Sequence, residues 1–295
     1  RIRYTKPGKG GYPHFLVPRA LLSLVGLLRL LQVVLCCITF SLAASGPSLV
    51  PPFGVWCLCS WCICFLLSLV ILGLEFLGLN SQLPLSWENF TSVAATLATL
   101  LTFTASIMYP IVFVPRDPTG WPYQAAATAT ALSCVCFVIY AVEVGLTWAR
   151  RGQLQGFLST VPGLLKVFEA YVAYVILALV DVDQMYAKNT GCQWCMAVFC
   201  FCFVGNLVIV GFSIGQWLGT LPLPVDKVLV ALTGLASLLY LSAAIVWPIF
   251  IFKDTIPNHQ FSSAVGATIL TYINLVAYTA DLVFSSRMMF FTEST

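Results

Sequence analysis

Six ionisable side chains lie inside long apolar segments of this chain, and they are the residues most able to do chemistry there. They are Arg29, Glu75, Glu143, Lys166, Glu169 and Asp281. A charge at membrane depth costs about 3 kcal/mol on insertion scales, so each of these residues is by default a hint of function. Two bases and four acids can form structural ion pairs, or they can line a path for protons or other ions.

The positions of the six residues favour a structural layer of ion pairs. All six are expected toward the cytoplasmic ends of their segments rather than at the midplane, and long basic side chains near a span end can extend to the headgroups. A proton or ion path, and simple extension to the headgroups, remain alternatives. The expected pairs are Arg29 with Glu143 or Glu75, and Lys166 with Asp281 or Glu169.

The twelve cysteines are expected mainly to pack. Inside an apolar helix, cysteine is a small residue that lets neighbouring helices approach closely. Cys192 and Cys195 form a Cys-x-x-Cys motif at an outer span end, where they could form a disulfide with each other or with Cys57 in an oxidising compartment. Zinc binding has less support, because a second pair of ligands is missing.

The sequence contains no catalytic motif. Its only histidines are His14 and His259, so an intramembrane His-Glu-x-x-His site cannot form. Neither a phosphate-binding glycine-rich loop nor the Gly-x-Gly-Asp setting of intramembrane aspartyl proteases occurs. We therefore expect a protein that is not an enzyme and has no cofactor and no metal.

The segments that must position these residues are transmembrane helices. The chain of 295 residues is 60% hydrophobic and 8% charged, with a mean hydropathy of +0.94, whereas soluble domains have about 25% charged residues. Eight apolar stretches can cross a hydrocarbon core of about 30 Å, which predicts an all-α integral membrane protein. They span residues 21–44, 54–77, 90–114, 123–148, 163–180, 194–217, 227–252 and 264–284.

The distribution of Lys and Arg predicts that both termini lie in the cytoplasm. Most of the basic residues then fall on the inner side, and only Arg116, Lys188 and Lys253 remain outside. The sequon at Asn89 falls in an inner loop and should carry no glycan. A net charge of +3 is too small and too scattered to suggest nucleic acid. The chain begins with Arg1 rather than Met, so we expect residues to precede it in the full-length protein.

The chain also repeats itself at a shift of 138 residues. LATLLTFTASIMYPI, residues 97–111, aligns with LASLLYLSAAIVWPI, residues 235–249. The first span joins at a shift of 137, which makes Arg29 the counterpart of Lys166. Because each unit has an even number of spans, the two units share one orientation, unlike the halves of inverted-repeat transporters. Other equivalent pairs are Gln32 with Glu169, Glu75 with Ser213, Tyr140 with Tyr278, and Glu143 with Asp281.

Several specific stretches resemble the myeloid-associated differentiation marker family. They are PLSWENF at 84–90, STVPGLLKV at 159–167, QWCMAV at 193–198 and INLVAYTADLV at 273–283. Members of that family carry two MARVEL domains, which are four-helix membrane modules. The resemblance implies a first domain at residues 18–151 and a second at residues 152–295, each a parallel copy of one four-helix bundle.

The resemblance also implies a function without catalysis. It suggests a multi-pass scaffold of the plasma membrane that organises ordered, raft-like, cholesterol-rich membrane and supports membrane apposition or cell junctions. The candidate partners are membrane lipids, including cholesterol, together with further copies of the chain or junction proteins. The alternative function is a channel or transporter with a charged layer at its cytoplasmic side.

Overall fold

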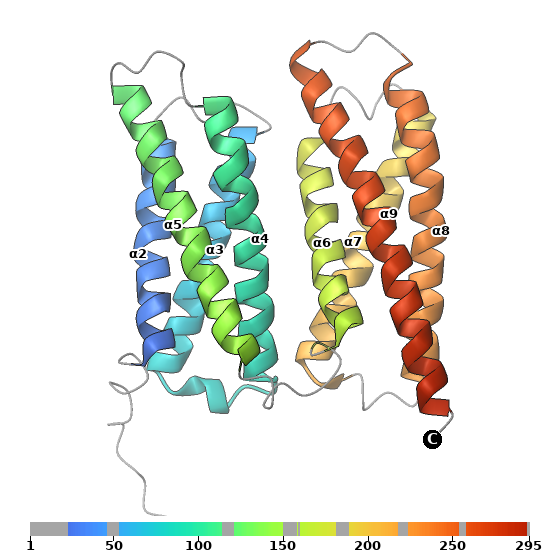
Figure 1. Cartoon of the computed structure of the whole chain (residues 1–295), viewed down its shortest axis with the longest axis horizontal. Helices are drawn as coiled ribbons and strands as arrows, with labels where there is room; N and C mark the ends of the chain where they lie inside the picture. The colour runs from blue at the N-terminus through green and yellow to red at the C-terminus, as the bar shows by residue number, and fades with distance from the viewer. Residues whose placement is uncertain are drawn as a thin grey trace, which may run out of the picture.

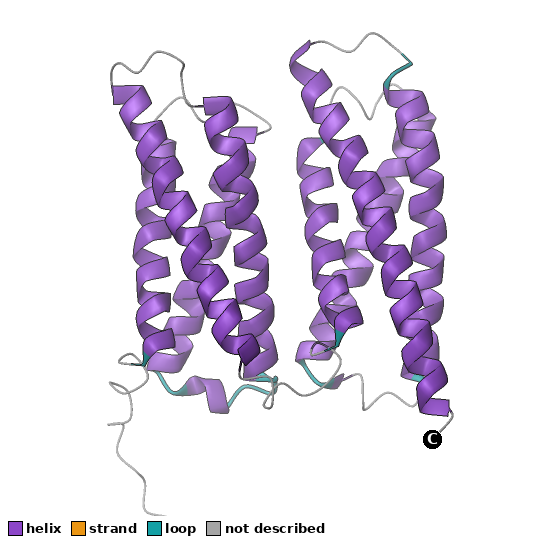
Figure 2. Ribbon diagram, in the orientation of Figure 1, coloured by secondary structure: helices purple, strands orange, loops and turns teal. Residues whose placement is uncertain are grey.

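The structure is a computed structural model that describes residues 23–45, 53–113, 121–149, 158, 160–180, 189–217, 224–253 and 258–293. Within these ranges the long elements are all helices, and strands are absent (Figure 2). This confirms the predicted all-α fold. The long helices are α2 (Leu24–Ala44), α3 (Phe53–Phe76), α4 (Trp87–Phe113), α5 (Trp121–Ala149), α6 (Val161–Leu179), α7 (Thr190–Ile214), α8 (Val225–Ile251) and α9 (Asn258–Glu293), and a short 3-10 helix, η1 (Leu79–Ser81), precedes α4.

All eight long helices are long and apolar enough to cross a membrane. Their bounds follow the predicted spans closely except in α7 and α9. Helix α7 begins at Thr190 rather than 194, and α9 continues to Glu293 rather than ending near 284. The hydroxyl groups of Ser285 and Ser286 donate hydrogen bonds within α9, to Asp281 Oδ1 and to the Leu282 carbonyl. Polar residues therefore continue this helix beyond the apolar stretch that hydropathy detects.

The helices form two four-helix bundles that lie side by side (Figure 1). In the first bundle α2 packs on α3 and α5, and α4 packs on the same two helices. The second bundle repeats this pattern, with α6 and α8 each packed on α7 and α9. The start of α2 and the end of α9 lie at the same end of the molecule, as an even number of spans requires (Figure 1).

Equivalent hydroxyl caps begin the first helix of each bundle. The Ser23 side chain accepts a hydrogen bond of 3.0 Å from the Gly26 amide at the start of α2. The Thr160 side chain accepts one of 3.3 Å from the Gly163 amide at the start of α6. Each cap satisfies a backbone donor that the first helical turn leaves free. The bases follow one to two turns later, at Arg29 and Lys166.

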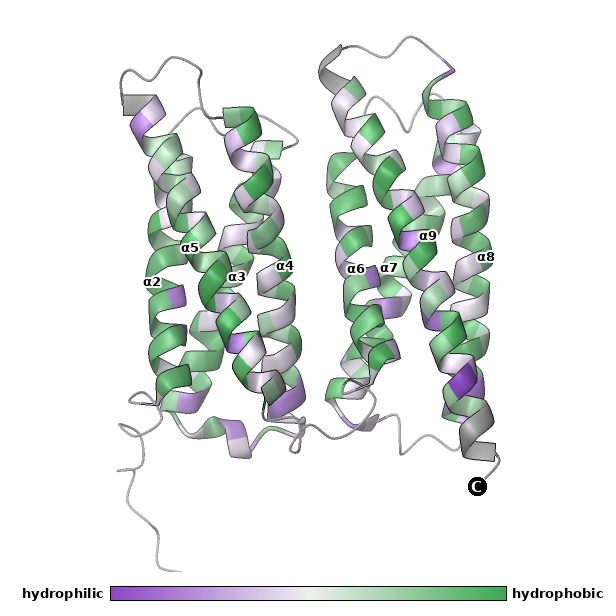
Figure 3. Cartoon of the chain, in the orientation of Figure 1, coloured by the Kyte–Doolittle hydropathy of each residue, from purple (hydrophilic) through white to green (hydrophobic). Residues whose placement is uncertain are grey.

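Small and aromatic residues fill the interior of both bundles. Cys36, Cys64 and Cys136 are completely buried, and this agrees with a packing role for cysteine. Hydrophobic residues run along most of the length of each helix, and hydrophilic residues interrupt them at only a few positions (Figure 3). Outward-facing residues such as Ile111, Leu238 and Val276 are strongly exposed and apolar, as lipid-facing side chains must be.

Helix α4 of the first bundle makes contact with α6 and α7 of the second. The hydroxyl groups of Thr104 and Tyr171 share a hydrogen bond between the bundles. Directly before α4, the Ser86 amide donates to the carbonyl of Ile214, the last residue of α7, at 2.8 Å. A cavity of about 270 Å³ lies between the bundles, and its accessible lining is entirely apolar. It is lined by Ile63, Val93, Leu97, Leu101, Val167, Ala170, Tyr171, Tyr174, Phe203, Leu207 and Val210.

Candidate functional site

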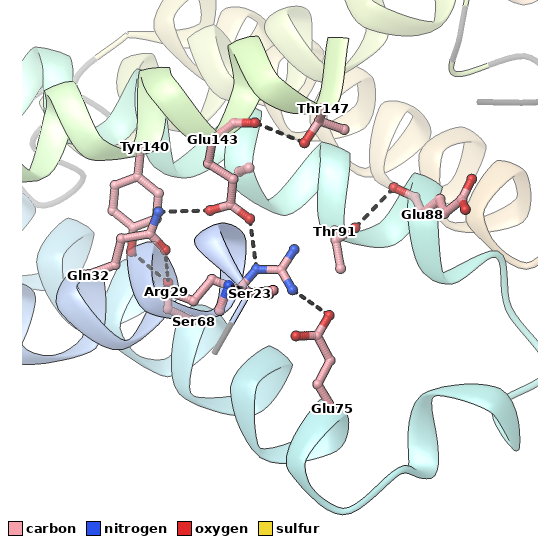
Figure 4. A network of polar contacts seen from close by, with 12 residues as sticks. Ser23, Arg29, Gln32, Ser68, Glu75, Glu88, Thr91, Tyr140, Glu143 and Thr147 are labelled. Atoms are coloured by element: carbon pink, nitrogen blue, oxygen red, sulfur yellow. Dashed lines mark hydrogen bonds and ion pairs between the residues drawn. The ribbon is translucent and has the colours of Figure 1, made fainter. Parts of the chain in front are cut away.

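The first bundle contains a buried cluster centred on Arg29 of α2. The Arg29 guanidinium lies between two carboxylates from different helices (Figure 4). Its Nε donates to Glu143 Oε1 of α5 at 2.7 Å, and its Nη1 donates to Glu75 Oε1 of α3. The planar guanidinium can hold both acids because its donors point in different directions. Arg29 thus pairs with both of its predicted partners.

A chain of neutral hydrogen bonds continues from Glu143 into the bundle (Figure 4). Gln32 Nε2 donates to Glu143 Oε2 at 2.7 Å, and the Ser68 hydroxyl donates to Gln32 Oε1 at 3.4 Å. The Tyr140 hydroxyl donates to Ser68 Oγ at 2.7 Å and also lies 3.2 Å from the Cys64 carbonyl. The network joins three helices of the bundle and satisfies most of its buried polar atoms.

The second bundle contains a cluster of the same kind around Lys166 of α6. Lys166 Nζ lies 2.9 Å from Glu169 Oε2 on the same helix and 2.7 Å from Asp281 Oδ2 on α9. The ammonium group also lies 5.1 Å from the centre of the Tyr278 ring, within reach of a cation–π interaction. Both partners predicted for Lys166 therefore contact it.

Neutral donors surround the two acids of the second cluster. Asn206 Nδ2 donates to Glu169 Oε2 at 3.2 Å and to the Tyr278 hydroxyl at 2.8 Å. Asp281 accepts hydrogen bonds from Thr233 at 3.3 Å and from Ser285 at 3.0 Å. The cluster therefore joins α6, α7, α8 and α9, all four helices of the second bundle.

Two contacts of the first cluster have counterparts in the second under the sequence repeat. Arg29 to Glu143 corresponds to Lys166 to Asp281, and Ser68 to Tyr140 corresponds to Asn206 to Tyr278. The third acid differs, because Glu75 of α3 has Ser213 as its counterpart and Glu169 replaces Gln32. Ser68 and Asn206 were not among the predicted site residues, although the shift of 138 relates them and would have identified them as a polar pair.

The expected depth of one residue needs correction. Glu169 lies eight residues after Val161, near the middle of the 19-residue helix α6 rather than toward its end. Helix α6 is the shortest of the eight, and much of it is covered by its neighbours. Glu169 therefore lies farther from the end of its helix than the sequence indicated.

The disulfide considered for Cys57, Cys192 and Cys195 does not form in the structure. All twelve cysteines lie among the described residues, and all are thiols. Cys57 is buried on α3 of the first bundle, whereas Cys192 and Cys195 are buried on α7 of the second. Cys195 Sγ instead donates to the Ala243 carbonyl at 3.8 Å, which places it against α8.

The chemistry that this arrangement supports is charge compensation inside a membrane. Removing one member of a buried pair leaves an uncompensated charge and typically destabilises a protein by about 3–5 kcal/mol. Both bases are held by at least one acid on another helix, so the pairs fix the rotation and axial register of those helices. Among the described residues, no group of three or more His, Cys, Asp and Glu side chains could hold a metal ion.

These features define a multi-pass membrane protein made of two tandem four-helix units, each closed around a buried base and its acids. The MARVEL family, described as a membrane-associating domain, matches residues 20–146 and again residues 157–284. The myeloid-associated differentiation marker of Rattus norvegicus is 39% identical over 292 residues, which cover 92% of each chain. The chain belongs to the myeloid-associated differentiation marker family of MARVEL proteins.

A second relative extends the similarity to nearly the whole chain. Myeloid-associated differentiation marker-like protein 2 of Homo sapiens is 38% identical over 301 residues, which cover 97% of each chain. The two MARVEL matches lie inside the two predicted halves, residues 18–151 and 152–295. No solved structure matches the chain.

Proposed function

We propose that this protein organises ordered, cholesterol-rich membrane and supports membrane apposition or cell junctions, and that it does so without catalysing a reaction. The proposed location is the plasma membrane, with both termini in the cytoplasm. The excess of Lys and Arg on the inner side supports this orientation. The eight candidate spans support it as well, because an even number returns the chain to the side from which it started.

The observation that carries the proposal is the separation of polar and apolar surface. The charged side chains of the two clusters face their own bundle interiors and pair there. The outer surface offers large apolar side chains, among them Leu238, which is 67% exposed. A protein with this surface interacts with its surroundings mainly through lipid hydrocarbon.

The cavity between the bundles offers a place for a particular lipid. Its aliphatic walls come from α3, α4, α6 and α7, and its aromatic side chains are Tyr171, Tyr174 and Phe203. In a bilayer such a space would be filled by hydrocarbon rather than by water, because apolar cavities stay dry. A rigid sterol ring system matches such walls with little loss of conformational entropy, so we propose cholesterol as the occupant.

The alternative, a channel or transporter, would need a polar path along the full length of a bundle. Within the described residues the ionic contacts reach no farther than the middle of α6. Beyond them the hydrogen bonds are neutral, such as that from Trp61 Nε1 to the Ser133 hydroxyl at 3.0 Å. This distribution supports the scaffold over the transporter.

Two measurements on the full chain in vesicles test the proposal. The protein should partition into the liquid-ordered phase only when cholesterol is present, and it should produce no ion flux above that of empty vesicles. Flux that is abolished by Glu143→Gln or Asp281→Asn would support transport instead.

Labelling with a photoactivatable cholesterol analogue tests the cavity itself. Leu207→Trp should reduce labelling severalfold, because the larger ring would fill the space that Leu207 lines. Leu238→Trp is the matched control on a lipid-facing position of α8, and it should label like the unmodified protein. Equal labelling of the two variants would contradict cholesterol binding between the bundles.

A further inference from the structure

Each buried cluster has one more acid than it has bases. Arg29 meets Glu75 and Glu143 in the first bundle, and Lys166 meets Glu169 and Asp281 in the second. If every group were ionised, each cluster would carry a net charge of one negative unit. The two clusters differ in whether water can reach that extra charge.

In the first cluster the extra charge has access to water. The Glu75 side chain is 19% exposed, and its Oε1 also accepts a hydrogen bond of 3.0 Å from Trp87 Nε1. A small cavity of about 10 Å³ adjoins Arg29 and Glu143, which is room for about one water molecule. Glu75 therefore lies at the edge of the bundle, where water can reach its carboxylate.

In the second cluster no member reaches the surface. Lys166 is 2% exposed, and the Glu169 and Asp281 side chains are both 0% exposed. One ammonium group cannot balance two buried carboxylates, and an isolated buried carboxylate is so unfavourable that it binds a proton instead. One of the two acids must therefore be neutral.

The hydrogen bonds identify which acid is neutral. Both carboxylate oxygens of Asp281 accept, Oδ2 from Lys166 and Thr233 and Oδ1 from Ser285, and donors of this kind stabilise the ionised form. Only Oε2 of Glu169 accepts hydrogen bonds, and its Oε1 has no partner among the described residues. Both Asp281 oxygens are thus already occupied by donors, and the unpartnered oxygen of Glu169 is the place for a proton.

The first bundle provides an independent argument. The counterpart of Glu169 is Gln32, a neutral amide with the shape of a protonated glutamate, and its neighbours Ser68 and Tyr140 match Asn206 and Tyr278. The repeated architecture thus already accommodates an uncharged side chain at this position. A protonated Glu169 side chain is uncharged, as the Gln32 side chain is at every pH.

We propose that the Glu169 carboxyl group is a proton-binding site that is occupied in the folded protein at neutral pH, beside a balanced pair of Lys166 and Asp281. The step is a simple association of one carboxylate with one proton from water. A metal cation is a poor substitute, because the Lys166 ammonium already lies between the two acids. This proposal does not depend on the proposed lipid function.

The remaining titratable groups around Glu169 do not supply another positive charge. Helix α4, which also packs on α6, carries a single charged residue, Glu88 in its first turn. The groups that interact electrostatically with Glu169 are Lys166 of its own helix, Cys202 of α7, Tyr240 of α8, and Tyr278 and Asp281 of α9.

Infrared difference spectroscopy of the full chain in nanodiscs at neutral pH tests the site directly. The spectrum of unmodified protein minus Glu169→Gln should contain the carbonyl band of a protonated carboxylic acid. Glu75→Gln, the matched change in the other cluster, should remove carboxylate bands only. If Glu169→Gln also removes only carboxylate bands, the proposal is wrong.

A second variant keeps the test decisive if Glu169→Gln fails to fold. Asp281→Asn leaves Lys166 with Glu169 as its only acid, so Glu169 should release its proton and the carboxylic acid band should disappear. If no carboxylic acid band is present in the unmodified protein, or if Asp281→Asn leaves the band intact, the assignment to Glu169 is overturned.

The pH dependence of stability offers a separate readout. The unfolded chain releases the Glu169 proton above about pH 4.3, whereas the folded chain keeps it, so folding binds a proton and stability must fall as pH rises. The melting temperature of the unmodified protein should therefore decrease relative to Glu169→Gln between about pH 5 and about pH 8. Parallel melting curves over this range would contradict the proposal.

Discussion

Replacing Lys166 by Met tests whether the buried cluster of the second bundle holds its helices together. Lys166 Nζ lies 2.7 Å from Asp281 and 2.9 Å from Glu169. At an effective dielectric constant of about 20, the pair of opposite charges on Lys166 and Asp281 has a gross attraction of about 6 kcal/mol. Desolvation offsets most of this attraction, and the expected loss on removing one partner of such a pair is about 3–5 kcal/mol.

A double-mutant cycle separates the ion pair from general effects of the substitution. We expect Lys166→Met to lower the melting temperature in detergent by several degrees, and Asp281→Asn to lower it less, because Glu169 can take over as the partner of Lys166. The double variant should be more stable than the sum of the single changes predicts, by about 1–3 kcal/mol.

The control for the loss of a lysine is Lys253→Met. Lys253 is exposed just after α8, so the same change there should be close to neutral. If Lys166→Met and Asp281→Asn proved additive, or if Lys253→Met were equally harmful, the buried pair would not be the source of the stability.

Two further predictions concern other parts of the molecule. Gly191→Ala on α7 should destabilise the protein by about 1–3 kcal/mol in a thermal assay, because the new Cβ would lie 2.5 Å from the Phe250 ring of α8. The matched control is Gly211→Ala, also on α7, which should be neutral because a Cβ there meets open space. Asn89 should carry no glycan in the correctly inserted full-length protein, because it lies buried in the first turn of α4 rather than in the predicted loop. A mobility shift on glycosidase treatment that is lost in Asn89→Gln would refute this prediction.

The sequence by itself determined the eight helices and their division into two equal units. A chain in lipid must satisfy its backbone hydrogen bonds within each span, so a long apolar stretch has one available structure. The repeat then assigned Arg29 to the position of Lys166, and Glu143 to that of Asp281. The six charged site residues could be identified from the sequence alone, because charged residues are rare within apolar spans.

The tertiary structure decided how those residues meet. Arg29 binds two acids at once, Glu169 lies in mid-helix with one oxygen unpartnered, and Ser68 and Asn206 complete the two networks. Such contacts depend on the rotation and crossing of several helices, and these are set by the packing of small residues such as Cys64 and Ala98 against one another. The periodicity of one helix contains no information about the helix that faces it. For this reason the sequence reduced the possible acidic partners of Arg29 and Lys166 to two each, but it could not show which of them make contact.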